Sequence, residues 1–294
     1  MEQNEEAILH AGQIAQQVRA YSKTIVKPGT PLLEIAEKLE AKIIELGGKP
    51  AFPVNLSLNE IAAHSTPSYN DVQKASGLLK VDFGVHIDGW VADTAETFNL
   101  DANPLHQQLI DTAKEALKQA TTDLTKATEL GSIGKKVNDT ALKAGFQPIH
   151  NLSGHSIHQF DLHAGQTIPN YDTGQSQAIG EGLCAIEPFI TSGVGRVREG
   201  RPSTIFSIAK ESSVRDPLAR ELLTFIQENY KTLPFCTRWL HKHFGTRALL
   251  ALQRLQQAGI IYQYPQLIEE SGAPVAQAEH TIFITKDKTT ITTG

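Results

Sequence analysis

Acidic side chains lie inside apolar runs that are typical of buried β-strands, and this feature constrains the fold more than any other. Three such residues stand within or at the start of these runs: Asp82 in residues 78–85, Glu187 in 183–190 and Glu279 in 278–285. Short apolar runs of this length predict strands. A buried carboxylate is costly unless a cation or hydrogen-bond donors compensate it. Each of these acids therefore needs such a partner in the folded chain.

The surrounding segments predict an α+β fold. Residues 85–98 alternate enough to indicate a second strand, joined to the first by a hairpin turn at Asp88-Gly89. Apolar residues at helical spacing predict helices over residues 5–25, 31–46, 104–129, 132–144 and parts of 214–258. Residues 51–70 are expected to be rich in loops. A helical module thus precedes the last predicted strand, and we expect it to be an insertion.

The sequence contains more potential metal ligands than a single structural salt bridge would use. Asp82 and Asp93 lie on the two arms of the predicted hairpin, so both can reach one point. His155 follows Gly154, and His163 lies in another glycine-rich segment. Four carboxylates and an imidazole suit a pair of hard or borderline divalent ions. Paired ions lower the pKa of a shared water and polarise a carbonyl oxygen.

Each residue also has a simpler interpretation. A carboxylate in a strand is often a structural ion-pair partner, and Asp88 is expected to serve only the turn. Cys184 is interpreted as a small buried apolar residue, and no role is predicted for His158, His241 or His243. The residues alone therefore indicate a metal site without naming a reaction.

Composition excludes several classes of protein. The chain has 294 residues, 40% of them hydrophobic, and a formal net charge of −5, which does not suggest a nucleic-acid-binding protein. Two cysteines imply no disulfide framework and a reducing compartment. Residues 1–6 are acidic and polar, unlike a signal peptide, and no apolar stretch approaches the roughly 20 residues of a membrane span. We expect a cytoplasmic monomer that binds neither membrane nor nucleic acid.

Several short segments together resemble the methionine aminopeptidases of peptidase family M24, in the short, archaeal-like form of their type 2 branch. The segments follow the family's order and cover most of the chain: Asn59-Glu60-Ile61-Ala62-Ala63-His64, Val81-Asp82-Phe83-Gly84, Asp93-Thr94-Ala95, Gly154-His155-Ser156-Ile157, Leu162-His163-Ala164-Gly165, Ile186-Glu187-Pro188-Phe189 and Glu279-His280-Thr281. Each is weak alone, and together they are specific.

This resemblance implies a fold and a set of ligands. The fold is the pita-bread arrangement, an α+β fold with two pseudo-symmetric halves around a cleft. Residues 1–199 and 271–294 would form the catalytic domain, and residues 200–270 an inserted helical, winged-helix-like subdomain. Two divalent ions of cobalt, manganese, iron or zinc would be held by the five implied ligands: Asp82, Asp93, His155, Glu187 and Glu279. Asp93 and Glu279 would bridge both ions.

The resemblance also implies an activity. The enzyme would remove the N-terminal methionine from peptides and nascent proteins when the second residue is small, by attack of a metal-bridging hydroxide. Glu187 would shuttle protons, and His64 and His163 would bind substrate and assist catalysis without holding metal. The implied methionine pocket comprises Phe52, Leu162, Phe189 and Tyr264, with His64 at its edge. The segment around Ile205 matches the family poorly. The implied partners are peptide N-termini, with a transient ribosome contact.

Two other interpretations remain open. A prolidase or aminopeptidase P shares the fold, but the predicted insertion and residues 61–64 favour the type 2 enzymes. A binding protein of the proliferation-associated type also shares the fold but lacks the metals, and all five implied ligands are present here. Metal analysis of the purified protein would distinguish such a metal-free binding protein from a metallopeptidase.

Overall fold

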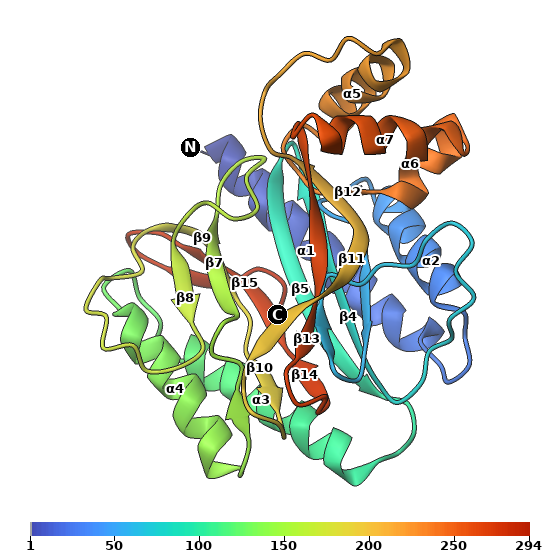
Figure 1. The fold of residues 1–294 in the computed structure, drawn as a ribbon. Helices are drawn as coiled ribbons and strands as arrows, with labels where there is room; N and C mark the ends of the chain where they lie inside the picture. The colour runs from blue at the N-terminus through green and yellow to red at the C-terminus, as the bar shows by residue number, and fades with distance from the viewer. Residues whose placement is uncertain (1) are drawn as a thin grey trace.

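The computed structural model describes residues 2–294 as helices packed on antiparallel sheets (Figure 1). The helices of the described residues are α1 (Glu2–Ile25), α2 (Leu32–Glu45), α3 (Pro104–Thr121), α4 (Leu130–Lys143), α5 (Pro217–Asn229), α6 (Thr237–Phe244) and α7 (Arg247–Gln257). Met1 lies outside the described residues. Among residues 2–294, no helix is long and apolar enough to cross a membrane.

The largest sheet forms the centre of the molecule. Its strands run in the order β1 (Lys49–Pro50), β4 (Leu78–Ile87), β5 (Trp90–Asn99), β15 (Glu279–Ile284), β9 (Gly182–Ile186), β7 (Ser153–Ile157) and β8 (Thr167–Pro169). Two further strands pair with strands inside this order, β2 (Asn55–Leu58) with β4 and β16 (Thr289–Ile291) with β15. Strand β15, near the end of the chain, therefore joins β5 from the first third of the chain to β9 from its middle.

Two smaller sheets complete the fold. One contains β14 (Val275–Gln277), β10 (Phe189–Thr191) and β6 (Gln147–Pro148). The other contains β12 (Phe235–Cys236), β11 (Val197–Ile208), β13 (Ile261–Glu269) and β3 (Ile61–Ala63). Because β3 pairs with β13, the segment that ends at His64 lies beside the predicted insertion.

Each half of the large sheet is covered by its own pair of helices. Helices α1 and α2 bury their apolar faces on β4 and β5, around residues such as Ile14, Leu39 and Val81. Helices α3 and α4 do the same on the half that contains β9 and β15. Burial of these apolar faces stabilises both helix pairs, and the opposite face of the sheet is left for other elements.

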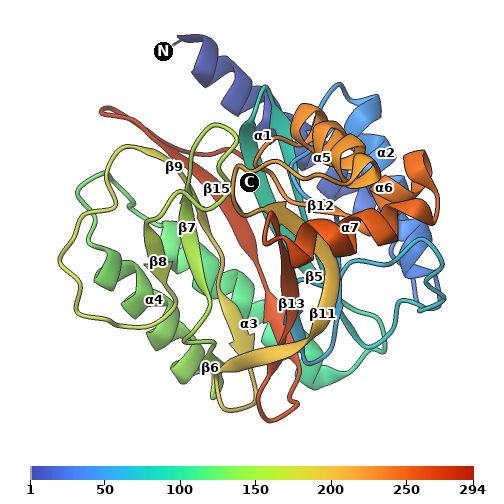
Figure 2. The same ribbon diagram turned by 45° about the horizontal axis from the view of Figure 1, so that its top comes forward.

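Helices α5, α6 and α7 gather at one end of the molecule next to α2 (Figures 1 and 2). They share a separate apolar core that includes Leu222, Phe235 and Leu252. This arrangement agrees with the expected helical module. The module is not purely helical, because its helices stand between the two long strands β11 and β13.

The structure also corrects three predicted elements. The helix predicted over 104–129 ends at Thr121, because the backbone becomes extended at Thr122 and turns left-handed at Asp123, where φ is +58°. The strand predicted over 183–190 is two strands, β9 and β10, since Pro188 has no backbone N–H to pair. The predicted loop over 51–70 contains the short strands β2 and β3.

Candidate metal centre

The five implied ligands come from distant parts of the chain and lie together in one cavity. Strand register explains the meeting of three of them. Asp82 on β4 and Glu279 on β15 are both paired with Ala95 of β5, from opposite sides. Asp93 lies two residues from Ala95, so the three side chains share one face of the sheet. Alanine between them leaves this face open.

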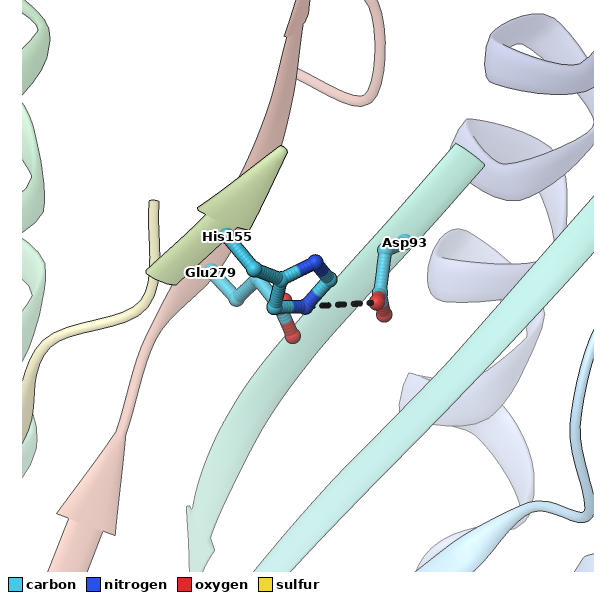
Figure 3. A group of neighbouring side chains, drawn as sticks. All are labelled: Asp93, His155 and Glu279. Carbon is cyan, nitrogen blue, oxygen red and sulfur yellow. Dashed lines mark ion pairs between the residues drawn. The ribbon is translucent and has the colours of Figure 1, made fainter. Parts of the chain in front are cut away.

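The other half of the sheet supplies the remaining two ligands. His155 on β7 is paired with Ala185 of β9, and Glu187 follows the end of β9. Figure 3 shows His155, Asp93 and Glu279 converging from three different strands. The donor atoms of these three residues all lie within 4.8 Å of one another. His155 Nε2 is 3.7 Å from Asp93 Oδ2 and 3.8 Å from Glu187 Oε1.

The carboxylates of the centre are buried and crowd one another. Burial raises the pKa of Asp82 to about 7. Burial first, and the neighbouring acids second, raise the pKa values of Asp93, Glu187 and Glu279 well above their usual range. Oδ1 of Asp82 and Oδ1 of Asp93 are buried and have no hydrogen-bond partner among residues 2–294. A divalent cation would supply both the missing positive charge and the missing partner.

The imidazole of His155 points its Nε2 toward the carboxylates of Asp93 and Glu187. Burial lowers its pKa to about 3, so the ring is neutral at physiological pH. Nδ1 lies 3.4 Å from the Ser156 carbonyl oxygen. Since a carbonyl only accepts, Nδ1 carries the proton and Nε2 offers its lone pair to the centre. The donor set therefore fits divalent cations.

The two other histidines of the cavity stand beside this centre. The ring of His163 lies 4.4 Å from that of His155, in an edge-to-face arrangement. His64 donates from Nδ1 to the Pro265 carbonyl at 3.1 Å, which leaves Nε2 as its acceptor. His64 also has φ +61°, a strained conformation for a residue other than glycine, and such strain gathers at functional sites.

The predicted pocket residues line the same cavity, whose volume is about 280 Å³. Phe52, Leu162, Phe189 and Tyr264 contribute its apolar surface. Ile205, around which the sequence matched the family poorly, also lines it. The cavity thus combines the carboxylate cluster with an apolar chamber.

Sequence reasoning missed one residue that touches the centre. Gln277 Nε2 lies 3.3 Å from Asp82 Oδ2, 3.4 Å from Glu187 Oε2 and 3.4 Å from Glu279 Oε2. An amide donor beside three carboxylates orients them and relieves part of their repulsion. Its position two residues before Glu279 was the one signal in the sequence.

The fold and the buried Asp, His and Glu cluster define a protein that binds divalent metal. Comparison with known proteins agrees. Residues 6–215 match the model of metallopeptidase family M24. Curated methionine aminopeptidases are 47% identical in Pyrococcus horikoshii, over 97% of this chain and 98% of that protein, and 45% identical in Thermococcus kodakarensis, over 98% and 99%. The chain belongs to metallopeptidase family M24, among its methionine aminopeptidases.

Solved structures support the fold. A methionine aminopeptidase from Thermotoga maritima superposes with a TM-score of 0.72 at 21% identity, over 100% of this chain and 97% of that one. A thermophilic Arx1 gives 0.84 at 18% identity, over 99% and 91%. The expected pita-bread fold is thereby confirmed. Neighbours this distant in sequence show the fold alone.

Proposed function

We propose that this aminopeptidase removes methionine from the N-termini of peptides and nascent proteins when the second residue is small. The observation that supports this most is the junction, within one cavity, of the carboxylate cluster and an apolar chamber. A chamber lined by Phe52, Phe189 and Tyr264 suits an unbranched thioether, which gains sulfur–aromatic contacts of about 0.3–1.5 kcal/mol. A charged first residue would lose its hydration without gaining a partner.

The metal site is proposed to hold two divalent cations of cobalt, manganese, iron or zinc. Its ligands would be Asp82, Asp93, His155, Glu187 and Glu279, with Asp93 and Glu279 shared between the ions. When bound, the cations supply a water of lowered pKa and polarise the peptide carbonyl. The crowding of four carboxylates around one imidazole supports two ions rather than one.

The chain's own residues would handle the protons and the developing charge. Glu187 accepts a proton from the attacking water and passes it to the leaving amine. His163 donates a hydrogen bond to the developing oxyanion. His64 contacts the substrate through Nε2, since Nδ1 is committed to the Pro265 carbonyl.

The division of the chain is also a proposal. Residues 1–199 and 271–294 form the catalytic domain, and residues 200–270 form the inserted subdomain. Pocket residues Ile205, Pro234 and Tyr264 belong to the insertion, which supports a role as the wall of the pocket. The insertion carries both signs of charge, so we expect it not to bind nucleic acid. A cytoplasmic location and a transient contact with the ribosome follow from action on nascent chains.

Measured kcat/KM over peptides varied at the first two positions tests this function. Peptides that begin Met-Ala, Met-Gly or Met-Ser should be cleaved, and Met-Lys or Met-Glu peptides hardly at all. Norleucine in place of methionine should still be accepted, because a change of this size discriminates by only about 1–3 kcal/mol. Broad cleavage of Leu-, Lys- and Met-first peptides, or a requirement for proline at position two, would instead favour a prolidase-like enzyme. Metal analysis of the purified protein should find two ions per chain.

A further inference from the structure

A buried ion pair joins the inserted helix α6 to the N-terminal helix α2. Arg238 donates to both oxygens of Glu40, from Nη1 to Oε2 at 2.5 Å and from Nη2 to Oε1 at 2.9 Å. Trp239 adds a third bond from Nε1 to Oε2 at 2.8 Å. Arg238 is 1% exposed and Glu40 5%. The two elements are thus fixed in angle as well as in distance.

The same pair holds two chain segments that enter the cavity. Glu40 Oε1 accepts from the backbone N–H of Val54 at 3.3 Å, two residues after Phe52. Arg238 Nη2 donates to Thr66 Oγ1 at 3.3 Å, two residues after His64, and its Nε donates to the Pro67 carbonyl at 3.2 Å. Thr66 Oγ1 closes the network by donating to the Val54 carbonyl at 2.7 Å.

Helix α6 is also continuous with the opposite wall of the cavity. It begins directly after β12, which pairs with β11 at Ile205 and Phe206. Pro234, immediately before β12, and Ile205 both line the cavity. The Glu40–Arg238 pair therefore connects the wall that carries Phe52 and His64 to the wall supplied by the insertion.

Stability alone does not explain such a pair. Desolvation of two charges cancels much of their attraction, and apolar residues of similar volume often stabilise a core equally well or better. A bidentate guanidinium–carboxylate contact adds what an apolar contact lacks, namely a fixed direction. The network thus provides geometric definition near the pocket.

We propose that Glu40 and Arg238 are positioning residues that set the spacing between the two walls of the methionine pocket. This inference rests on the proposed function, because it assigns the pocket to the first residue of the substrate. Neither Glu40 nor Arg238 is among the described residues that line the cavity. Both act through the segments that bear Phe52 and His64.

The double variant Glu40→Leu/Arg238→Met tests the proposal, since it removes both charges and leaves neither unpaired in the core. We expect it to fold with unchanged metal content but with a lower thermal midpoint, because the Val54 N–H and Trp239 Nε1 lose their acceptor. The KM for a Met-Ala peptide should rise roughly tenfold or more, with a smaller change in kcat, because small displacements of a binding wall weaken productive binding. Its preference for Met-first over Leu-first peptides should narrow.

Lys242→Met is the matched control. Lys242 lies on the same helix and pairs with Glu37 of α2 at 3.0 Å, but both side chains are exposed. Its removal should leave KM and selectivity unchanged. A folded double variant with wild-type KM and selectivity would overturn the proposal, and so would a loss of metal that accounts for the whole defect. If the wild type itself shows no preference for methionine, the proposed function fails instead.

Discussion

At the scale of single residues, burial gives the acids of the centre their chemistry. Asp82, Asp93, Glu187 and Glu279 resist ionisation, because they are buried and lie close to one another. His155 resists protonation because it is buried. The same side chains at the surface would be ordinary charges. Two substitutions test the proposed distinction between residues that bind metal and residues that move protons or stabilise charge.

Glu187→Gln should reduce kcat on the order of 10²-fold or more, the usual contribution of a general acid–base group. The amide keeps an oxygen donor but cannot accept the proton. Steady-state kinetics with metal analysis of the same sample checks this. Glu181→Gln, which alters an exposed acid paired with Lys126, serves as the control and should be silent. Near-normal kcat with full metal loading would exclude the shuttle role.

His163→Ala should slow turnover by an amount equivalent to about 3 kcal/mol, the cost of removing an oxyanion donor. Its metal content should stay at the wild-type level, because Asp93, His155 and Glu279 already group their donor atoms without it. His155→Ala provides the contrast and should lose metal. An empty metal site in the His163→Ala protein would mean that His163 is a ligand.

At the scale of elements, close packing between strands fixes where the ligands stand. Gly154 precedes His155 on β7, and a Cβ at that position would lie 2.3 Å from the Ala185 carbonyl oxygen of β9. Only glycine therefore allows β7 and β9 to pair at this point. The break between β9 and β10 also helps to position a site residue, since it places Glu187 at the boundary between two sheets.

Gly154→Ala should lower the free energy of unfolding by about 1–3 kcal/mol, the usual cost of overpacking. It should also weaken metal binding, because displacement of β7 moves His155. Gly145→Ala is the control: Gly145 has φ +83° and nothing near its Cβ position, so alanine strains the backbone far from the centre. Denaturant unfolding and metal titration of both variants check this. Equal metal affinity in the two would refute the link between β7 packing and the centre.

At the scale of the whole molecule, the centre joins both halves of the sheet, so its charge state affects global stability. In the metal-free protein, the raised pKa of Asp82, about 7, means that the folded chain retains a proton that the unfolded chain releases above its ordinary pKa near 3.8. The contribution of Asp82 to the stability of the metal-free form is therefore fully present below about pH 4 and is lost as the pH rises toward 7. Bound cations remove this penalty.

A chelator should accordingly lower the thermal midpoint more at about pH 7.5 than at about pH 5. Metal affinity should rise over the same interval, with release of protons that calorimetry in different buffers can measure. Asp93→Asn removes one of the crowded charges, so the chelated variant should melt above the chelated wild type at the higher pH. An equal effect of the chelator at both pH values would show that the acids do not titrate in this range.

Much of the fold followed from local patterns. Helical spacing identified α1, α2 and α4 to within a few residues, and the Asp88-Gly89 turn joined β4 to β5 as expected. The predicted boundaries failed at the end of α3, where Asp123 is left-handed, and at Pro188, whose missing N–H interrupts the strand. The long strands β11 and β13 were not anticipated, because their register is interrupted and their sequence does not alternate.

The sequence by itself determined which residues are present in the site, since every implied ligand and pocket residue lies in one cavity. An acid within an apolar strand can be recognised from the sequence alone, because its apolar neighbours in the chain already indicate that its carboxylate will be buried at a cost in free energy. Only the tertiary structure decided which atoms meet: the shared register at Ala95, the contact of Gln277 with three acids, and the Glu40–Arg238 network. Each of these includes at least one pairing between residues about 180 to 200 positions apart, and no local pattern records such a pairing.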